Sequence, residues 1–186
     1  MNKKTITKWI AGICLAIITT VNTNAAGYIK FDGIEGESAV TSHKGWSDIL
    51  SFSQGLHRSK PGRGISGATR RRGSVSFGDL VVVKELDKAS PKLAESVATG
   101  RVFPRVALEM TARTDAGETT YYRYELINVQ VTSYQIGTDN TDLLPVENFS
   151  LNFEEIKVTY TGLEFGNGDK PDAGTEYSWK VEEGEK

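Results

Sequence analysis

The sequence predicts a mainly β fold, a small barrel or two-sheet sandwich of about eight strands with one short flanking helix. Most of the chain consists of segments that alternate apolar and polar residues with a period of two, as half-buried strands do. Glycine is frequent, at 19 of 186 residues, which suits a fold with many turns. Convincing helix signals are confined to residues 84–100. We therefore expect one domain built from strands, with one helix packed against it by a single face.

Length and composition indicate an ordinary globular domain. Charged residues make up 25% of the chain and hydrophobic residues 38%, both typical of soluble proteins. A chain of 186 residues is long enough to form one hydrophobic core.

The first 25 residues have the pattern of a secretory signal peptide. A basic start is followed by an apolar run at 9–21 and by polar and small residues at 22–26. The apolar run is too short to span a bilayer comfortably. We expect cleavage after Ala25, which leaves a mature domain at 26–186. Cleavage after Ala26 and an uncleaved N-terminal anchor are the alternatives.

Cleavage would change both the charge and the cysteine content. It removes three lysines and no acid, leaving 19 basic and 24 acidic residues and a net charge of −5. It also removes Cys14, the only cysteine, so the mature chain would have no disulfide, thiol nucleophile or cysteine metal site. Cys14 is not expected to carry lipid, because the apolar run continues past it. A mildly acidic chain favours neither nucleic acid nor a stable membrane association.

Two strands are predicted before the middle of the chain, at 26–35 and 45–54. Residues 55–73 then form a long arm rich in glycine and arginine, with almost no apolar side chains. A loop of this length in a compact domain is usually functional or disordered. A third strand follows at 74–84, and its run Leu80–Val83 is expected to be buried on both faces.

The predicted helix has signals at both ends. We expect Ser90 to cap its N-terminus and Pro91 to occupy the first helical position. Leu93 and Val97 lie four residues apart and form a narrow apolar stripe. Gly100 suits the left-handed position just past the last turn. These signals predict a helix of two to three turns.

Three strand-like segments follow the helix. Residues 106–111 and 119–133 alternate on either side of a turn at 115–117, which predicts a hairpin. The last long strand is expected at 146–161, where the apolar parity changes at Glu154-Glu155. Because side chains alternate faces strictly, this change requires a bulge or a change of sheet. The tail at 166–186 is expected to be loose apart from 177–179.

No motif predicts catalysis, a cofactor or a metal. The glycine pattern at 62–67 matches a dinucleotide fingerprint but lacks the strand before it and the helix after it. The two histidines, His43 and His57, are most simply loop residues, and no serine elbow or zinc motif occurs. The arginines of the arm lack the interleaved aromatics of nucleic-acid surfaces. They are expected to be solvated or to pair with carboxylates of another copy. Further carboxylate pairs (Glu154 with Glu155, and Asp169 with Asp172) are expected to be solvent-exposed.

The helix region carries a family resemblance. Residues 84–93, Lys-Glu-Leu-Asp-Lys-Ala-Ser-Pro-Lys-Leu, followed by Ala-Thr-Gly at 98–100, resemble the central signature of Hcp, the tube protein of bacterial type VI secretion. Softer matches run through nearly all of the mature chain, at 28–38, in the arm, and at 122–129, 144–147, 149–153 and 156–160.

The resemblance implies a small β-barrel with one helix that assembles into hexameric rings. In that family the rings stack into a tube, which a contractile sheath propels out of the cell, and the lumen shelters small effectors. The expected partners are therefore further copies of the chain, the type VI sheath, the spike and effectors, with a secreted location and a structural rather than enzymatic role. By the same likeness the arm reaches toward the adjacent ring. Arg70, Arg71 and Arg72 are expected near a subunit or ring contact.

The predicted signal peptide departs from the family, whose members generally lack one. It keeps a second hypothesis open, an exported Hcp-like binding or carrier module that acts outside a secretion machine. A third, a periplasmic enzyme on a β-barrel, is disfavoured by the missing catalytic set.

Overall fold

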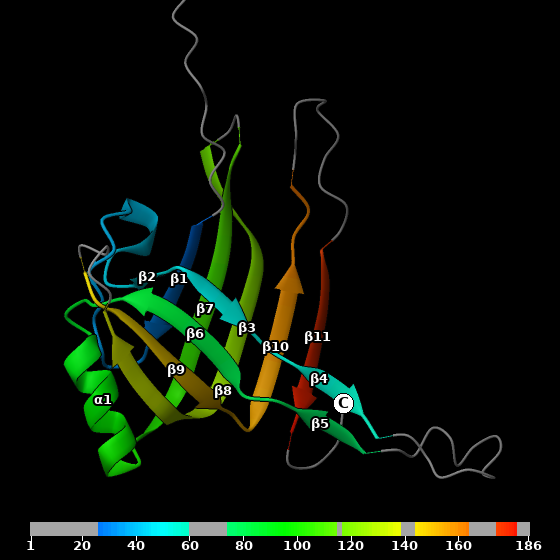
Figure 1. Cartoon of the computed structure of the whole chain (residues 1–186). Helices are drawn as coiled ribbons and strands as arrows, with labels where there is room; N and C mark the ends of the chain where they lie inside the picture. Colours follow the sequence, from blue (N-terminus) through cyan, green and yellow to red (C-terminus); the bar gives the residue numbers. More distant parts are fainter. Residues whose placement is uncertain (1–25, 60–73, 115–116, 139–143, 164–173, 182–186) are drawn as a thin grey trace, which may run out of the picture.

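A computed structural model describes residues 26–59, 74–114, 117–138, 144–163 and 174–181. The signal-like segment, most of the arm and parts of the tail lie outside these ranges. Within them the fold contains eleven strands, one α-helix and one 3-10 helix (Figure 1). The elements are β1 (Ala26–Phe31), η1 (Thr41–His43), β2 (Ser47–Ile49), β3 (Ser51–Ser53), β4 (Leu56–Arg58), β5 (Val75–Phe77), β6 (Leu80–Glu85), α1 (Ser90–Thr99), β7 (Val102–Thr114), β8 (Gly117–Gly137), β9 (Val146–Asn152), β10 (Glu155–Tyr160) and β11 (Thr175–Lys180).

The predicted fold class, mainly β with one flanking helix, is confirmed. The described strands outnumber the expected eight because bends divide predicted strands. The segment 45–54 becomes β2 and β3, and 146–161 becomes β9 and β10. Two strands, β4 and β11, were not predicted as such.

One curved sheet organises the molecule, in the order β2-β1-β7-β8-β9-β6-β3. Its two end strands are consecutive in the chain, because Leu50 alone separates β2 from β3. The Leu50 backbone N–H donates to the Val83 carbonyl of β6 (2.8 Å). The sheet thus curls until its ends meet the same short segment, which encloses a core of aliphatic and aromatic side chains.

The long strand β8 joins the two halves of the sheet. Its first part pairs with β10 and its last part with β9, both antiparallel. The bend lies at Asn128, whose φ of 52° is left-handed. Opposite it, between β9 and β10, the Glu154 carboxylate accepts a hydrogen bond from the Asn128 side chain (2.6 Å). The predicted change of parity at Glu154-Glu155 is therefore confirmed as a paired break in two neighbouring strands.

The helix α1 lies at one end of the curled sheet beside β8 (Figure 1). Leu93 is fully buried and Gly100 has the left-handed φ of 67° that the sequence predicts. The prediction of Ser90 as N-cap is wrong. Ala89 occupies that position, and Ser90 is the first helical residue. The Ser90 hydroxyl instead accepts from the Asp87 backbone N–H (3.0 Å), because the preceding loop turns back onto it.

Two further predictions need correction. Val81 and Val83 on β6 are only half-buried, so Leu80–Val83 is not buried on both faces. The tail is not loose from 174 onward, because β11 (Thr175–Lys180) pairs along the whole of β10. Its aromatic residues supply the reason, since Trp179 packs against the hydrophobic core. Residues 166–173 and 182–186 lie outside the described parts. No helix among the described residues has the length and apolar character needed to cross a membrane.

Candidate functional site

A buried ion pair fixes the loop before α1 to the sheet. Lys84 of β6 and Glu147 of β9 are register partners, and both are 0% exposed. The Lys84 Nζ lies 2.8 Å from Glu147 Oε1 and 2.9 Å from Asp87 Oδ1. It also donates to the Glu85 carbonyl (2.7 Å). Among the described residues Glu147 Oε1 accepts no hydrogen bond, so it interacts with Lys84 as an ion pair.

Neighbouring groups complete this cluster. The Tyr134 hydroxyl donates to Glu147 Oε2 (2.6 Å). Burial, together with the nearby Glu147 carboxylate, raises the pKa of Tyr134. Burial alone would raise the pKa of Asp87, but hydrogen bonds from Ser47 and Lys84 outweigh it, so the pKa is lowered. The Asp87 carboxylate also accepts from the Ala89 backbone N–H (2.9 Å). The stretch at 84–93 therefore carries a buried polar cluster that holds the start of the helix against the sheet.

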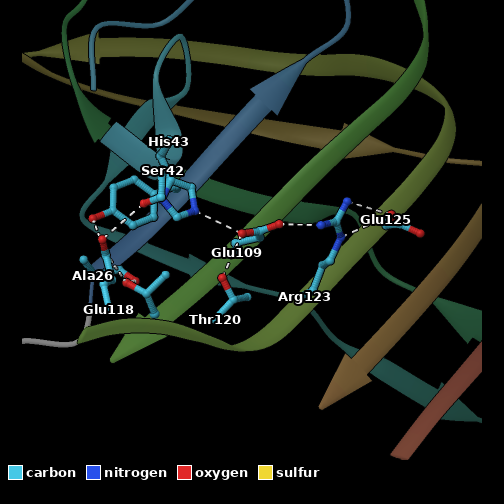
Figure 2. A network of polar contacts seen from close by, with 10 residues as sticks. Ala26, Ser42, His43, Glu109, Glu118, Thr120, Arg123 and Glu125 are labelled. Atoms are coloured by element: carbon cyan, nitrogen blue, oxygen red, sulfur yellow. Dashed lines mark hydrogen bonds and ion pairs between the residues drawn. The ribbon is translucent and has the colours of Figure 1, made fainter. Parts of the chain in front are cut away.

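A second polar cluster lies around His43, between η1 and the outer face of β1 and β7 (Figure 2). The loop carrying η1 folds tightly, because Gly36 lies against the Trp46 backbone, where an added Cβ would sit 2.2 Å from the carbonyl oxygen. His43 is 4% exposed and stacks on Tyr28, with ring centroids 3.9 Å apart. Its Nε2 lies 3.0 Å from Glu109 Oε2. The expectation that His43 is a plain loop residue is therefore wrong, because the loop folds inward over the sheet.

Glu109 is held from three directions. Besides His43, the Thr120 hydroxyl donates to its Oε2 (3.0 Å) and Arg123 Nη1 donates to its Oε1 (2.6 Å). Arg123 in turn contacts Glu125 Oε1 through Nη2 (2.8 Å), as Figure 2 shows. The carboxylate is thus immobilised, and it fixes the orientation of the imidazole.

A neighbouring carboxylate, Glu118, accepts hydrogen bonds from Tyr28 (2.8 Å), Thr111 (2.8 Å) and Ser42 (3.3 Å). Burial and the Glu118 contact raise the pKa of Tyr28 to about 12. Burial alone would raise the pKa of Glu118, but the three hydroxyl donors outweigh it, so the pKa is lowered. The Ser42 hydroxyl also lies 2.9 Å from His43 Nδ1. Ser42 therefore links the hydrogen bonds around Glu118 to those around His43 and Glu109.

This polar cluster borders an open cleft of about 460 Å³. Its walls come from η1, β7, β8 and the end of β10, and they include Ser42, His43, Glu109, Thr120, Arg123 and Thr159. Ser42 is exposed there, whereas His43 and Glu109 are buried behind it.

A second hollow, of about 430 Å³, lies at the base of the arm. The arm begins in β4 and returns in β5, and these strands pair as a separate two-stranded sheet. Leu56, Phe77, Tyr177 and Trp179 line the hollow, and Leu56 and Tyr177 are 53% and 40% exposed. The base of the arm is therefore an apolar surface beside the edge strand β11 (Figure 1).

The structure places the remaining predicted residues as follows. Ala26 begins β1, whereas Ala25 and the arginines Arg70, Arg71 and Arg72 lie outside the described residues. His57 is exposed on β4, away from His43. Among the described residues no group of histidine, cysteine and carboxylate side chains has the arrangement of a metal site.

Sequence reasoning missed both polar clusters, although one left a signal. The period-two pattern of Leu80 and Val82 continues to Lys84, and that of Phe149 and Leu151 extends back to Glu147. Both charges therefore occupy core-facing positions that the alternation marks. No comparable signal links His43 to Glu109, because they are 66 residues apart and meet only through folding.

Comparison with known proteins places this fold. The family model described as "Type VI secretion system effector, Hcp" matches residues 28–160. The chain is 27% identical over 154 residues to Protein hcp1 of Pseudomonas aeruginosa, covering 83% of this chain and 93% of that relative. A solved structure of a type six secretion system protein aligns with a TM-score of 0.78 at 26% identity, covering 87% of this chain and 99% of the other. The fold of Hcp1 from Salmonella typhimurium aligns with a TM-score of 0.67 at 23% identity, covering 87% and 97%.

The described residues form a curved β sheet with one helix packed against it, and the family model matches most of the chain. These findings identify a component of type VI secretion. The chain belongs to the Hcp family.

Proposed function

We propose that the chain is a tube subunit of a type VI secretion system, which assembles into rings of six that stack into an exported tube carrying effectors. The family match over residues 28–160 is the observation that carries this proposal. The proposed role within the machine is structural, and the further partners are its sheath, its spike and its effectors.

Features of the surface support self-assembly. Leu56 and Tyr177 leave an apolar hollow open at the base of the arm, and β11 is an edge strand of its sheet. Contiguous apolar surface and free strand edges are where copies of a chain usually meet. We place the ring-to-ring contact at the arm, with Arg70, Arg71 and Arg72 close to it.

Light scattering and negative-stain microscopy on residues 26–186 test the assembly. Rings of six, especially stacked ones, are the expected result. A monomer at every concentration would contradict the tube proposal. It would favour the second candidate, an exported binding or carrier module, for which the signal-like segment at 1–25 is the supporting observation.

We also propose that residues 1–25 are a cleaved signal peptide and that 26–186 is the mature domain. The first described strand starts at Ala26, so cleavage after Ala25 would remove none of the described residues. The N-terminal sequence of protein recovered from the periplasm and medium tests this. A start at Ala26 is expected, whereas recovery of the chain beginning at Met1 would contradict cleavage.

A further inference from the structure

The hydrogen bonds that link Ser42, His43 and Glu109 form an arrangement that the proposed tube function does not use. An exposed serine hydroxyl lies 2.9 Å from a buried imidazole, and the other nitrogen of that imidazole lies 3.0 Å from a buried carboxylate. We propose that Ser42 is a nucleophilic site for small acyl and phosphonyl groups, with His43 as its general base and Glu109 as a positioning residue. The order of groups is that of a nucleophile, its base and an orienting acid.

The count of protons supports this arrangement. A carboxylate only accepts hydrogen bonds, so the nitrogen facing Glu109 must carry the hydrogen. In the neutral ring this hydrogen is on Nε2, which leaves a lone pair on Nδ1. Nδ1 lies 2.9 Å from the Ser42 oxygen, so its lone pair can accept the hydroxyl hydrogen when the hydroxyl turns away from Glu118. The competing acceptor, Glu118 Oε2, lies farther from the Ser42 oxygen, at 3.3 Å.

The base is held in one orientation. Its ring is stacked on Tyr28 at 3.9 Å and 12° and contacts the edge of Trp46, with centroids 5.1 Å apart. Glu109 is itself fixed by Thr120 and Arg123 (Figure 2). An orienting carboxylate that cannot move keeps the ring in the tautomer that a general base needs.

The site is also accessible. Ser42 is exposed at the cleft of about 460 Å³, which is the size of a small-molecule site. The lining hydroxyls and Arg123 suit a small polar acyl group rather than a long lipid chain.

The proposed step balances without any further reactant. The Ser42 oxygen forms a bond to the carbonyl carbon of an activated ester, and its proton passes to His43 Nδ1. The alcohol leaves with the electron pair of the broken C–O bond and takes that proton back from His43. With a fluorophosphonate probe the same oxygen bonds to phosphorus, the P–F bond breaks, and fluoride leaves.

The test uses the full chain and a small fluorophosphonate probe. We expect one label per chain by intact mass, and peptide mapping places it on Ser42. Ser42→Ala abolishes the label. Ser53→Ala, which removes an exposed serine of β3, leaves it unchanged. No label above the Ser42→Ala background, or label spread over several serines, overturns the proposal.

Two variants test the assigned roles. His43→Gln is expected to slow labelling about 100-fold, the size of a general-base contribution. Glu109→Gln slows labelling, and Glu109→Asp restores part of the rate, which a purely structural role would not require. Because His43 is buried, its variant is compared only if its near-ultraviolet circular dichroism matches the parent. If it does not, the wild-type label map and Ser42→Ala decide the matter.

Discussion

At the residue scale, charged side chains occupy places that strand alternation reserves for apolar ones. Lys84 and Glu147 face the core from neighbouring strands, and both are fully buried. Removing two charges from water is costly, and their attraction offsets that cost only when both are present and well placed. The pair is therefore better understood as a constraint on geometry than as a net source of stability. Lys84 also contacts Asp87 and Ser90, and so ties the loop after β6 to the sheet.

Loss of one partner tests this view. Lys84→Ala leaves the Glu147 carboxylate buried without its cation, and we expect a loss of about 3–5 kcal/mol in the free energy of unfolding. Urea unfolding followed by tryptophan fluorescence measures it. Lys92→Ala removes an exposed lysine of α1 and is expected to leave the urea midpoint unchanged. Equal midpoints for the two variants would show that the buried pair imposes no such constraint.

The lowered pKa of Asp87 predicts how stability depends on acid. An unfolded aspartate titrates at about pH 3.9, and the folded one titrates lower, so the unfolded chain binds more protons between the two values. Stability from this group is fully present above the unfolded pKa and is lost as pH falls through the folded pKa.

Urea midpoints measured from about pH 6 down to about pH 2 test this dependence. Asp87→Asn is expected to flatten the acid limb without abolishing it, because the pKa of Glu118 is lowered too. Asp48→Asn, an exposed change on β2, keeps the parental slope. A parental slope in Asp87→Asn would refute the assignment.

At the scale of elements, the fold depends on where strands break and where the helix stops. The sheet bends because β8 and the neighbouring β9–β10 segment change parity at the same level. At this bend Asn128 takes the left-handed conformation, and its side chain donates a hydrogen bond to Glu154. Asparagine tolerates this conformation better than most residues, since its short polar side chain bonds locally.

The bend at Asn128 is testable by substitution. Asn128→Val is expected to destabilise the fold by about 1–2 kcal/mol, because a β-branched residue is strained at positive φ. Asn128→Gly should lose less, since it removes the Glu154 contact but relieves the backbone. Gln130→Val, two residues on and also exposed, serves as the control and should be harmless. Thermal unfolding compares them. A tolerated Asn128→Val would mean that the bend does not need the left-handed residue.

The end of the helix gives a second test at this scale. Gly100 has φ of 67° and open space around its Cα, so an added methyl group would meet no atom. Gly100→Ala should therefore cost about 1 kcal/mol from backbone strain alone. Gly55→Ala, where space is equally open and φ is not left-handed, should cause no loss. A similar midpoint of urea unfolding in both variants would contradict the strain argument.

At the scale of the whole molecule, the described fold ends in an edge strand, β11, beside the base of the arm. The paired strands β4 and β5 form the base of the arm, and β11 lies beside them (Figure 1). The proposed assembly would use this exposed apolar surface.

The arginines of the arm give the prediction at this scale. Triple alanine substitution of Arg70, Arg71 and Arg72 is expected to weaken stacking and to reduce its dependence on salt, because charge pairs between copies are lost. Light scattering over a salt series measures assembly. Triple alanine substitution of Lys88, Lys92 and Lys157 removes the same charge from other surfaces and should leave stacking intact. Unchanged tubes over the whole series in the arginine variant would contradict this role.

The sequence by itself determined the elements whose causes are local. Alternation located the hairpin of β7 and β8, the helix signals located α1 and Gly100, and the parity change located the break before Glu155. Each depends on neighbouring residues, whose periodicity is visible in the chain. The family signature at 84–93 could likewise be recognised in the sequence, although the buried ion pairs of Lys84 could not.

The tertiary structure alone decided which distant groups meet. His43 reaches Glu109, and Ser42 reaches His43, because the loop with η1 folds over β1 and β7. β4 and β11 were missed because their short segments become strands only when a partner supplies the hydrogen bonds. Propensity and periodicity describe a segment, whereas burial and charge pairing depend on what the rest of the chain places against it.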